Sequence, residues 1–238
     1  MRIFLSLFLI ALVAHAEPTA RVSQWNGYDK FDFTVADRPA LLVKPKTPAE
    51  GHPWIWRTEF FGHEPQGDIA LLAAGWHVAY FKVSDMYGAP SSIELMAKFH
   101  DYAVREYGLS KRVVLEGFSR GGLYAVNFAA AHPDKTAALY LDAPVLDIRS
   151  WPGGKGKGKG DARCWKQALE IFNLTEETAK SCLREQKNAY KHEDQLLRVN
   201  EIARQRGYLK PAEDRAIIEA MLKVKPVTLR PEIGRAHV

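Results

Sequence analysis

The sequence predicts an α/β fold in which a mostly parallel sheet carries helices on both faces. From residue 53 onward, apolar runs of strand length alternate with longer segments that have helical apolar spacing. This alternation is typical of a parallel sheet covered by helices. The chain has 238 residues, of which 47% are hydrophobic and 26% charged. Such a length and composition allow a sizeable core and exclude collagen-like, coiled-coil and wholly disordered proteins.

A leader precedes the fold. Arg2 gives a positive start, residues 3–13 are almost entirely apolar, and residues 14–16 form an Ala-His-Ala cleavage pattern. This pattern is typical of a signal peptide over residues 1–16. The alternative is an N-terminal membrane anchor, but the apolar run is shorter than the roughly 20 residues that span a bilayer. We therefore expect a secreted or periplasmic protein with no stable membrane anchor.

Six segments have the alternating or β-branched apolar pattern of strands. They are residues 28–35, 40–43, 54–57, 76–83, 111–116 and 137–141. The first two lie within residues 21–43 and predict an antiparallel hairpin at the start of the sheet. The spacing also predicts three helical segments. These are an amphipathic turn through residues 69–72, a helix over 91–107 closed by Gly108, and a helix over 123–132 ended by Pro133.

The clearest motif is Gly-Phe-Ser-Arg-Gly at residues 117–121, between the strand 111–116 and the helix 123–132. A very tight turn there would hold Ser119 in a strained backbone conformation, and the flanking glycines avoid Cβ clashes with neighbouring elements. Ser119 then lies at the positive end of the following helix, which stabilises an alkoxide or oxyanion. The pattern favours a nucleophilic serine over one that caps an ordinary helix.

Several segments resemble the α/β-hydrolase superfamily over roughly residues 20–150. They are the Ser119 motif, Ala-Ala-His-Pro-Asp at 130–134 and Leu-Asp-Ala-Pro at 141–144. Residues 54–65 and 150–160 also resemble segments of secreted bacterial α/β-hydrolases that occur among polysaccharide-degrading proteins. The resemblance implies a secreted serine hydrolase of the esterase type. It would act on a small-molecule or glycan ester, with acylated carbohydrate as one candidate.

The expected chemistry is two-step acyl transfer, in which Ser119 attacks an ester carbonyl and forms an acyl-enzyme. Two backbone N–H groups would form the oxyanion hole. One belongs to Arg120, and the other comes from the loop after residues 54–57. We expect Phe60 to supply this second donor, with Glu59 as the alternative.

A catalytic acid and a histidine should follow the serine in this fold. The downstream histidines are His132, His192 and His237. His132 lies about thirteen residues along the helix, on the order of 20 Å from Ser119 at 1.5 Å per residue. It fits a helix C-terminus better than a general base. His192 lies between two predicted lid helices and is expected to be a surface histidine. Asp142 and Asp147 follow the next strand, where they either supply a carboxylate or only shape the pocket.

Residues 146–222 differ from the rest because they have helical patterns without strands. Helices are expected over 163–172, 176–187, 193–206 and 211–223. An inserted helical lid over the site accounts for this pattern. At its start, residues 153–160 match G-x-x-x-x-G-K, but Gly160 stands where a phosphate-binding loop needs Ser or Thr. We expect instead a cationic loop that either meets an acidic substrate or forms a solvated hinge.

The last residues do not complete such a fold. Residues 223–231 resemble the start of the next core strand, and residues 232–238 match the translation of a common sequencing adapter. We therefore expect the last core strand or strands, the acid and the histidine to be missing, and His237 to belong to a non-native tail. On this expectation the chain itself is inactive or nearly so. The predicted organisation is a signal peptide (1–16), an α/β-hydrolase core (17–145), a helical lid (146–222), the start of a strand (223–231) and the tail (232–238).

Composition adds a few further expectations. Cys164 and Cys182 form one disulfide or remain two separate thiols. The formal net charge of +5 is too small and too scattered to indicate nucleic-acid binding. No metal or cofactor is expected, and the oligomeric state cannot be inferred from the residues.

Two other classes of protein fit part of the pattern. A serine peptidase of the prolyl-oligopeptidase type would use the same serine turn, but it normally carries a large additional domain. A non-catalytic binding protein would keep the sheet and lose the triad, although the intact serine motif argues against such decay.

Overall fold

The structure, a computed structural model, describes residues 20–155 and 158–179. Within these ranges a seven-stranded sheet has the order β1-β2-β3-β5-β4-β6-β7. The strands are β1 (Arg21–Trp25), β2 (Tyr28–Val35), β3 (Arg38–Lys44), β4 (Trp54–Arg57), β5 (His77–Phe81), β6 (Val113–Phe118) and β7 (Thr136–Asp142). The helices are α1 (Gln66–Ala73), α2 (Pro90–Tyr107), α3 (Gly121–Ala131) and α4 (Ala162–Ile171).

Five of the seven strands run in the same direction. β5, β4, β6 and β7 pair in parallel. β3 is antiparallel to both β5 and β2, so β2 runs with the parallel group, and β1 runs against it. The predicted α/β class and mostly parallel sheet are therefore confirmed. Because β5, β4 and β6 are neighbours, the loops that leave their carboxyl ends lie at one edge of the sheet.

The antiparallel side of the sheet contains one strand more than the sequence patterns indicated. β1 and β2 are joined by Asn26 and Gly27, whose φ angles are 48° and 78°. Positive φ at both central residues is the requirement of a type I′ hairpin turn, for which Asn-Gly is the preferred pair. The Asn-Gly dipeptide was the available signal for this first hairpin.

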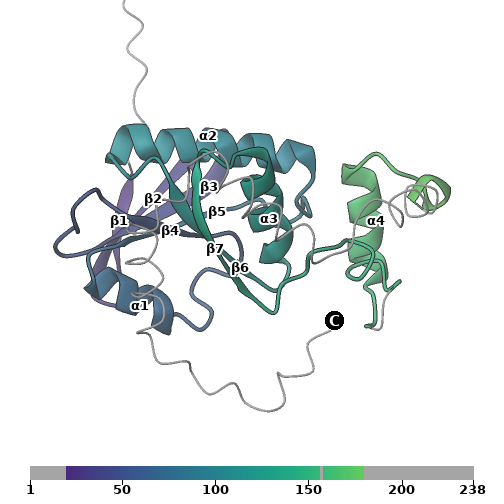
Figure 1. Ribbon diagram of the computed structural model, residues 1–238, viewed down its shortest axis with the longest axis horizontal. Helices are drawn as coiled ribbons and strands as arrows, with labels where there is room; N and C mark the ends of the chain where they lie inside the picture. Colours follow the sequence, from purple (N-terminus) through teal and green to yellow (C-terminus); the bar gives the residue numbers. More distant parts are fainter. Residues whose placement is uncertain (1–19, 156–157, 180–238) are drawn as a thin grey trace, which may run out of the picture.

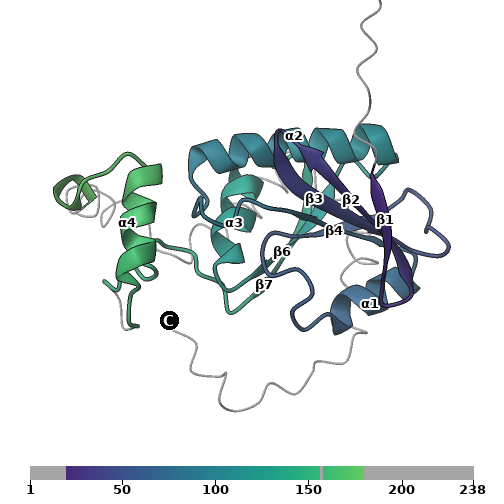
Figure 2. The same ribbon diagram turned by 180° about the vertical axis from the view of Figure 1, so that it is seen from behind.

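Helices cover both faces of the sheet, as predicted. Figures 1 and 2 show α2 and α3 on one face and α1 on the other. Alternate residues of the strands divide between the two cores, because successive side chains of a strand point to opposite faces. On β4, Trp54 and Trp56 join the core under α2 and α3, while Ile55 joins the core under α1.

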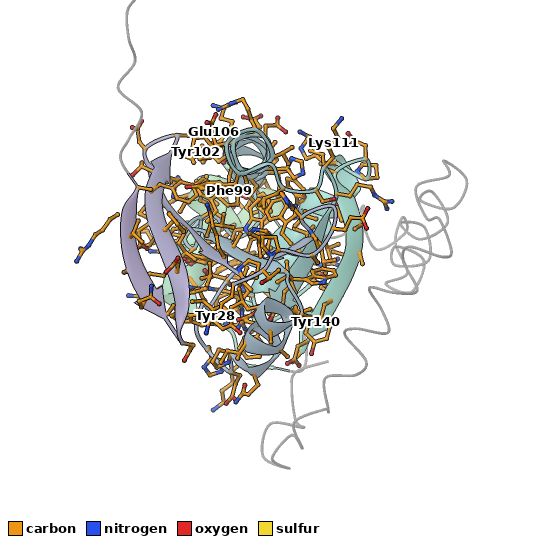
Figure 3. All side chains as sticks on the ribbon, turned by 90° about the vertical axis from the view of Figure 1, so that its left-hand side faces the viewer. Tyr28, Phe99, Tyr102, Glu106, Lys111 and Tyr140 are labelled. Atoms are coloured by element: carbon orange, nitrogen blue, oxygen red, sulfur yellow. The ribbon has the colours of Figure 1, made fainter. Side chains whose placement is uncertain are left out.

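Aromatic side chains fill the larger core. Phe99 of α2 is fully buried and contacts the rings of Trp56 and Phe81, with centroids 4.7 and 5.0 Å away. Figure 3 shows Phe99 between α2 and the sheet. Each such ring removes on the order of 150–250 Å² from water. This packing makes a rigid base for the loops at the carboxyl edge.

The helix α4 confirms the first helix predicted after the core. The Asp161 side chain caps it by accepting a hydrogen bond from the Cys164 N–H at 2.8 Å. Trp165 and Ala168 pack with Tyr87 and Leu123 in a third cluster, and both ribbon views show α4 on the side that carries α3 (Figures 1 and 2). Of the described helices, none has the length and apolarity needed to cross a membrane.

Several predicted segments lie wholly or mostly outside the described residues. These are the leader over 1–16, the helices over 176–187, 193–206 and 211–223, the strand start at 223–231 and the tail over 232–238. Cys164 is buried and has no disulfide partner in the described part. Cys182 falls outside it, so the choice between a disulfide and two thiols stays open.

Candidate active site

Ser119 lies in a tight turn between β6 and α3. Its φ angle is 51°, in the left-handed region that costs a non-glycine residue on the order of 1–3 kcal/mol. The surroundings hold it there: the Ser119 N–H donates to the Asp142 carbonyl at 3.0 Å, and the Ser119 carbonyl accepts from the Val145 N–H at 2.7 Å. The turn predicted for residues 117–121 is therefore present, at the carboxyl end of β6, which pairs with β4 on one side and β7 on the other.

Ser119 is not the N-cap of the helix. Arg120 occupies the N-cap position, and no side-chain capping hydrogen bond is made there. The alternative of an ordinary capping serine is therefore wrong. Ser119 instead lies one residue before the cap, at positive φ.

The glycines around Ser119 allow close approach rather than positive φ. A Cβ on Gly117 would lie 2.8 Å from the Leu141 side chain, and one on Gly122 would lie 2.6 Å from Pro144 and 2.7 Å from the Val145 carbonyl oxygen. A Cβ on Gly121 would lie 3.0 Å from the Thr58 hydroxyl. The turn is thus packed against β7 on one side and the loop after β4 on the other.

That second loop is attached to the turn through Thr58. The Thr58 N–H donates to the Glu116 carbonyl at 3.0 Å, and its hydroxyl lies 2.8 Å from the carbonyl oxygens of both Glu116 and Gly121. Beyond it, Phe60 has a φ of 53°. The loop therefore leaves β4 in a fixed direction past the start of α3.

Backbone donors are available on both sides of the turn. No atom of residues 20–155 and 158–179 accepts a hydrogen bond from the N–H of Arg120, Phe60 or Glu59. The Glu59 nitrogen would lie 3.5 Å from a Cβ on Gly121, which brings the Glu59 end of the loop close to the helix start. Unpaired backbone N–H groups need an acceptor from water or a ligand. Both residues proposed from the sequence for the second donor thus have an N–H without an acceptor among the described residues.

The side chains of Glu59 and Arg120 form an ion pair beside these donors. Arg120 Nε donates to Glu59 Oε2 at 2.5 Å, and the Ser84 hydroxyl donates to Glu59 Oε1 at 2.7 Å. Glu59 is only 2% exposed. The Arg120 guanidinium also lies over the Phe60 ring, 5.2 Å from its centroid. Sequence reasoning treated Glu59 only as a backbone donor and missed this role of its side chain.

A second buried charge cluster joins β4, α1 and β6. Arg57 NH1 contacts Asp68 at 2.7 Å, and its NH2 contacts Glu116 at 3.0 Å. Burial raises the pKa of Glu116 to about 7, because desolvation and the charges of Asp68 and Asp142 outweigh the attraction of Arg57. Burial also raises the pKa of Asp68 despite its hydrogen bond to Arg57. The carboxyl groups of Asp68 and Glu116 share the single positive charge of Arg57. This arrangement favours one of the two carboxyl groups remaining protonated near neutral pH.

Aromatic rings pack against Phe118, the residue that precedes Ser119. Phe118 contacts the ring of Phe60 edge-on, with centroids 5.6 Å apart, and stacks with the exposed His63 ring at 5.2 Å. Phe60 and Phe118 are half-buried, so part of each side chain is accessible to solvent.

No histidine among the described residues forms a hydrogen bond with Ser119. His132 is the C-cap residue of α3, as predicted, and its ring contacts Phe128. His192 and His237 lie outside the described residues. Of the two aspartates, Asp142 ends β7 and contacts Ser119 through its backbone, while Asp147 pairs with Arg149. Neither carboxylate contacts the Ser119 side chain.

The Gly-Lys segment does not continue a strand. Gly154 has a φ of 60°, and a Cβ on Gly160 would lie 2.5 Å from the Pro152 carbonyl oxygen and 2.7 Å from the Gly154 nitrogen. The segment therefore closes on itself at its base before α4. In the described part of the chain, no three His, Cys, Asp or Glu residues gather as a metal site would require.

The sequence matches no protein-family model and no curated protein. Solved structures similar to the chain include the lipase A of Candida antarctica, with 11% identity, a TM-score of 0.45 and coverage of 66% of this chain and 47% of the lipase. Another is an S-formylglutathione hydrolase from Agrobacterium tumefaciens, with 14% identity, a TM-score of 0.44 and coverage of 63% and 73%. A third is a cold-adapted esterase from an Arctic intertidal metagenomic library, with 12% identity, a TM-score of 0.42 and coverage of 51% and 61%.

The chain spans less than two thirds of the length of the lipase and of the esterase. The assignment of the α/β-hydrolase fold rests on the chain's own topology, namely the strand order with β4 between β5 and β6, the helices on both faces and the turn at Ser119.

Proposed function

We propose that the protein is a serine hydrolase that cleaves carboxylic esters through an acyl-enzyme on Ser119. The observation that carries this proposal is the Ser119 backbone, held at a φ of 51° between the parallel strand β6 and a helix, beside N–H groups that have no acceptor in the described part of the chain. Strain of this kind persists only where the surroundings impose it, and it gathers at functional sites.

In the proposed reaction, Ser119 Oγ attacks the ester carbonyl and forms a tetrahedral intermediate. The N–H of Arg120 and one N–H of the loop after β4, from Phe60 or Glu59, donate to the oxyanion. Collapse of the intermediate expels the alcohol and leaves an acyl-serine. Water then releases the acid by the same steps. A histidine oriented by an acid transfers the protons, and both are proposed to lie outside the described residues.

The proposed substrate is a small-molecule or glycan ester, with acylated carbohydrate as one candidate. The apolar rings of Phe60 and Phe118 next to Ser119 support an ester with an apolar part. No cofactor takes part in the proposed steps.

Export of the protein is part of the proposal. Signal peptidase is expected to cleave after residue 16, so the mature protein would begin at Glu17. Mass spectrometry of the secreted or periplasmic fraction of the native host tests this, and recovery of the intact leader from the soluble, non-exported fraction contradicts it.

Hydrolysis of p-nitrophenyl esters by the purified full-length protein tests the activity. Ser119→Ala is expected to lower kcat on the order of 10³-fold or more, since it removes the nucleophile. Ser91→Ala, which removes an exposed hydroxyl at the start of α2, is expected to leave kcat unchanged. Cleavage of peptide substrates in preference to esters would favour a peptidase, and binding of esters without turnover would favour a non-catalytic protein.

A further inference from the structure

Three loops meet at the Glu59 carboxylate. Glu59 follows β4, Ser84 follows β5, and Arg120 follows β6. In the sheet β4 lies between β5 and β6, so Glu59 lies between its two partners in the same order as the strands. One carboxylate oxygen accepts from Ser84 at 2.7 Å and the other from Arg120 at 2.5 Å.

We propose that Glu59 is a positioning residue, whose carboxylate fixes the loop after β4 against the turn at Ser119 and thereby sets the geometry of the oxyanion donors. This inference rests on the proposed function. Glu59 and Arg120 each have an unpaired backbone N–H in the described part of the chain, and their side chains join the two segments that carry those groups. Stabilisation of an oxyanion depends on donors held at the correct distance before the reaction begins.

The pair has the properties that such a role requires. A carboxylate that is 2% exposed is stable only with strong partners, and a charge-assisted hydrogen bond to Arg120 is one of the strong kinds. The Phe60 ring lies under the Arg120 guanidinium, so the residue next to Glu59 is held by the same cation. The Arg120 side chain therefore contacts two consecutive residues of the loop.

The Ser84 side of the network is equally fixed. The Tyr124 hydroxyl of α3 donates to the Ser84 carbonyl at 2.8 Å and accepts from the Tyr87 N–H at 2.9 Å. The loop after β5 is thus anchored to the same helix that begins at the Ser119 turn. Glu59 closes this arrangement, because it contacts both the anchored Ser84 and Arg120.

Kinetics of Glu59 variants of the full-length protein test the inference. Glu59→Ala is expected to lower kcat on p-nitrophenyl acetate roughly 10- to 100-fold, because displaced donors bind the oxyanion less well. KM should stay within about threefold, since the donors act mainly in the transition state. Phenylboronic acid forms a tetrahedral adduct with the serine. Its inhibition constant should rise by a factor similar to the fall in kcat.

Glu59→Gln can accept from Arg120 and donate to the Ser84 hydroxyl, so it is expected to recover kcat to within about threefold of the wild type. Glu50→Ala, which truncates an exposed glutamate, should change none of these values. A folded Glu59→Ala protein with wild-type kcat overturns the inference, and so does Glu59→Gln with a kcat as low as that of Glu59→Ala. If Glu59→Ala fails to fold, the Ser84→Ala variant tests the inference instead. Its kcat is expected to fall at least about threefold with KM unchanged. An unchanged kcat in Ser84→Ala overturns the inference.

Failure of this inference and failure of the proposed function give different results. If Ser119→Ala keeps wild-type turnover, the proposed function is wrong. If Ser119→Ala abolishes turnover while folded Glu59→Ala keeps it, only the positioning role is wrong.

Discussion

The Ser119 N–H donates to the Asp142 carbonyl at 3.0 Å. Phe118 and Asp142 are the last paired residues of β6 and β7, so this bond extends the parallel ladder one residue into the turn. The positive φ of Ser119 is therefore a consequence of sheet pairing on one side and of the start of α3 on the other. Changes that disturb either side should move the serine.

Gly122→Ala is expected to destabilise the protein and displace the turn. The new Cβ would lie 2.6 Å from Pro144 and 2.7 Å from the Val145 carbonyl oxygen, and the Val145 N–H holds the Ser119 carbonyl. Overpacking of this kind costs on the order of 1–3 kcal/mol. Urea denaturation measures the loss.

Gly67→Ala is the matched control for that experiment. Gly67 lies in α1, and a Cβ there meets no atom within 4 Å. Replacement by alanine is expected to stabilise the helix by about 0.5–1 kcal/mol. Equal stability of Gly122→Ala and the wild type would contradict the close packing of the turn.

The buried cluster of Arg57, Asp68 and Glu116 predicts a pH dependence of stability. Because the pKa of Glu116 is raised from 4.5 to about 7 in the folded protein, the folded state binds this proton more tightly than the unfolded state. The contribution of Glu116 to stability is therefore greatest below pH 4.5 and is lost as pH rises through about 7.

Glu116→Gln should remove most of this dependence. Between pH 5.5 and 8.5, the free energy of unfolding of the wild type is expected to fall relative to Glu116→Gln by on the order of 2 kcal/mol, at 1.36 kcal/mol per pKa unit. Denaturation at both pH values measures the difference. Glu50→Gln, at an exposed position, should follow the wild type, and a parallel course of Glu116→Gln and wild type would refute the raised pKa.

Tyr124→Phe should destabilise the loop after β5. The mutation leaves the Tyr87 N–H without its acceptor and the Ser84 carbonyl without its donor, and a buried polar group left unpaired costs on the order of 1–3 kcal/mol. Tyr140→Phe removes a hydroxyl from a residue that is 45% exposed and is expected to change stability by less than about 0.5 kcal/mol. Equal effects in thermal denaturation would contradict the anchoring role of Tyr124.

Periodicity and turn chemistry predicted much of the fold. The strands β2 and β4 have the bounds expected from the sequence, and the turn at Ser119 lies where the glycines indicated. These features depend on local patterns, which a single sequence contains. The apolar patterns did not predict β1 as a separate strand, although the Asn26-Gly27 dipeptide is typical of the hairpin turn that joins it to β2.

The charge networks could not be predicted in the same way. Glu59 and Arg120 are 61 residues apart, and only the strand order places them together. Arg57 and Glu116 carry a partial signal, since each interrupts an apolar strand and a buried charge needs a partner. The sequence does not say which partner each one takes. The proposed acid and base have no local pattern of this kind, because they are expected on loops after later strands.

Labelling with a fluorophosphonate tests the central claim most directly, because the reagent reacts covalently with activated serines. The purified full-length protein is treated with the reagent, digested and mapped by mass spectrometry. The adduct is expected on Ser119, and Ser119→Ala should abolish labelling while Ser91→Ala keeps it. Labelling that persists in a folded Ser119→Ala protein, or an adduct mapped to another serine, would show that Ser119 is not the nucleophile.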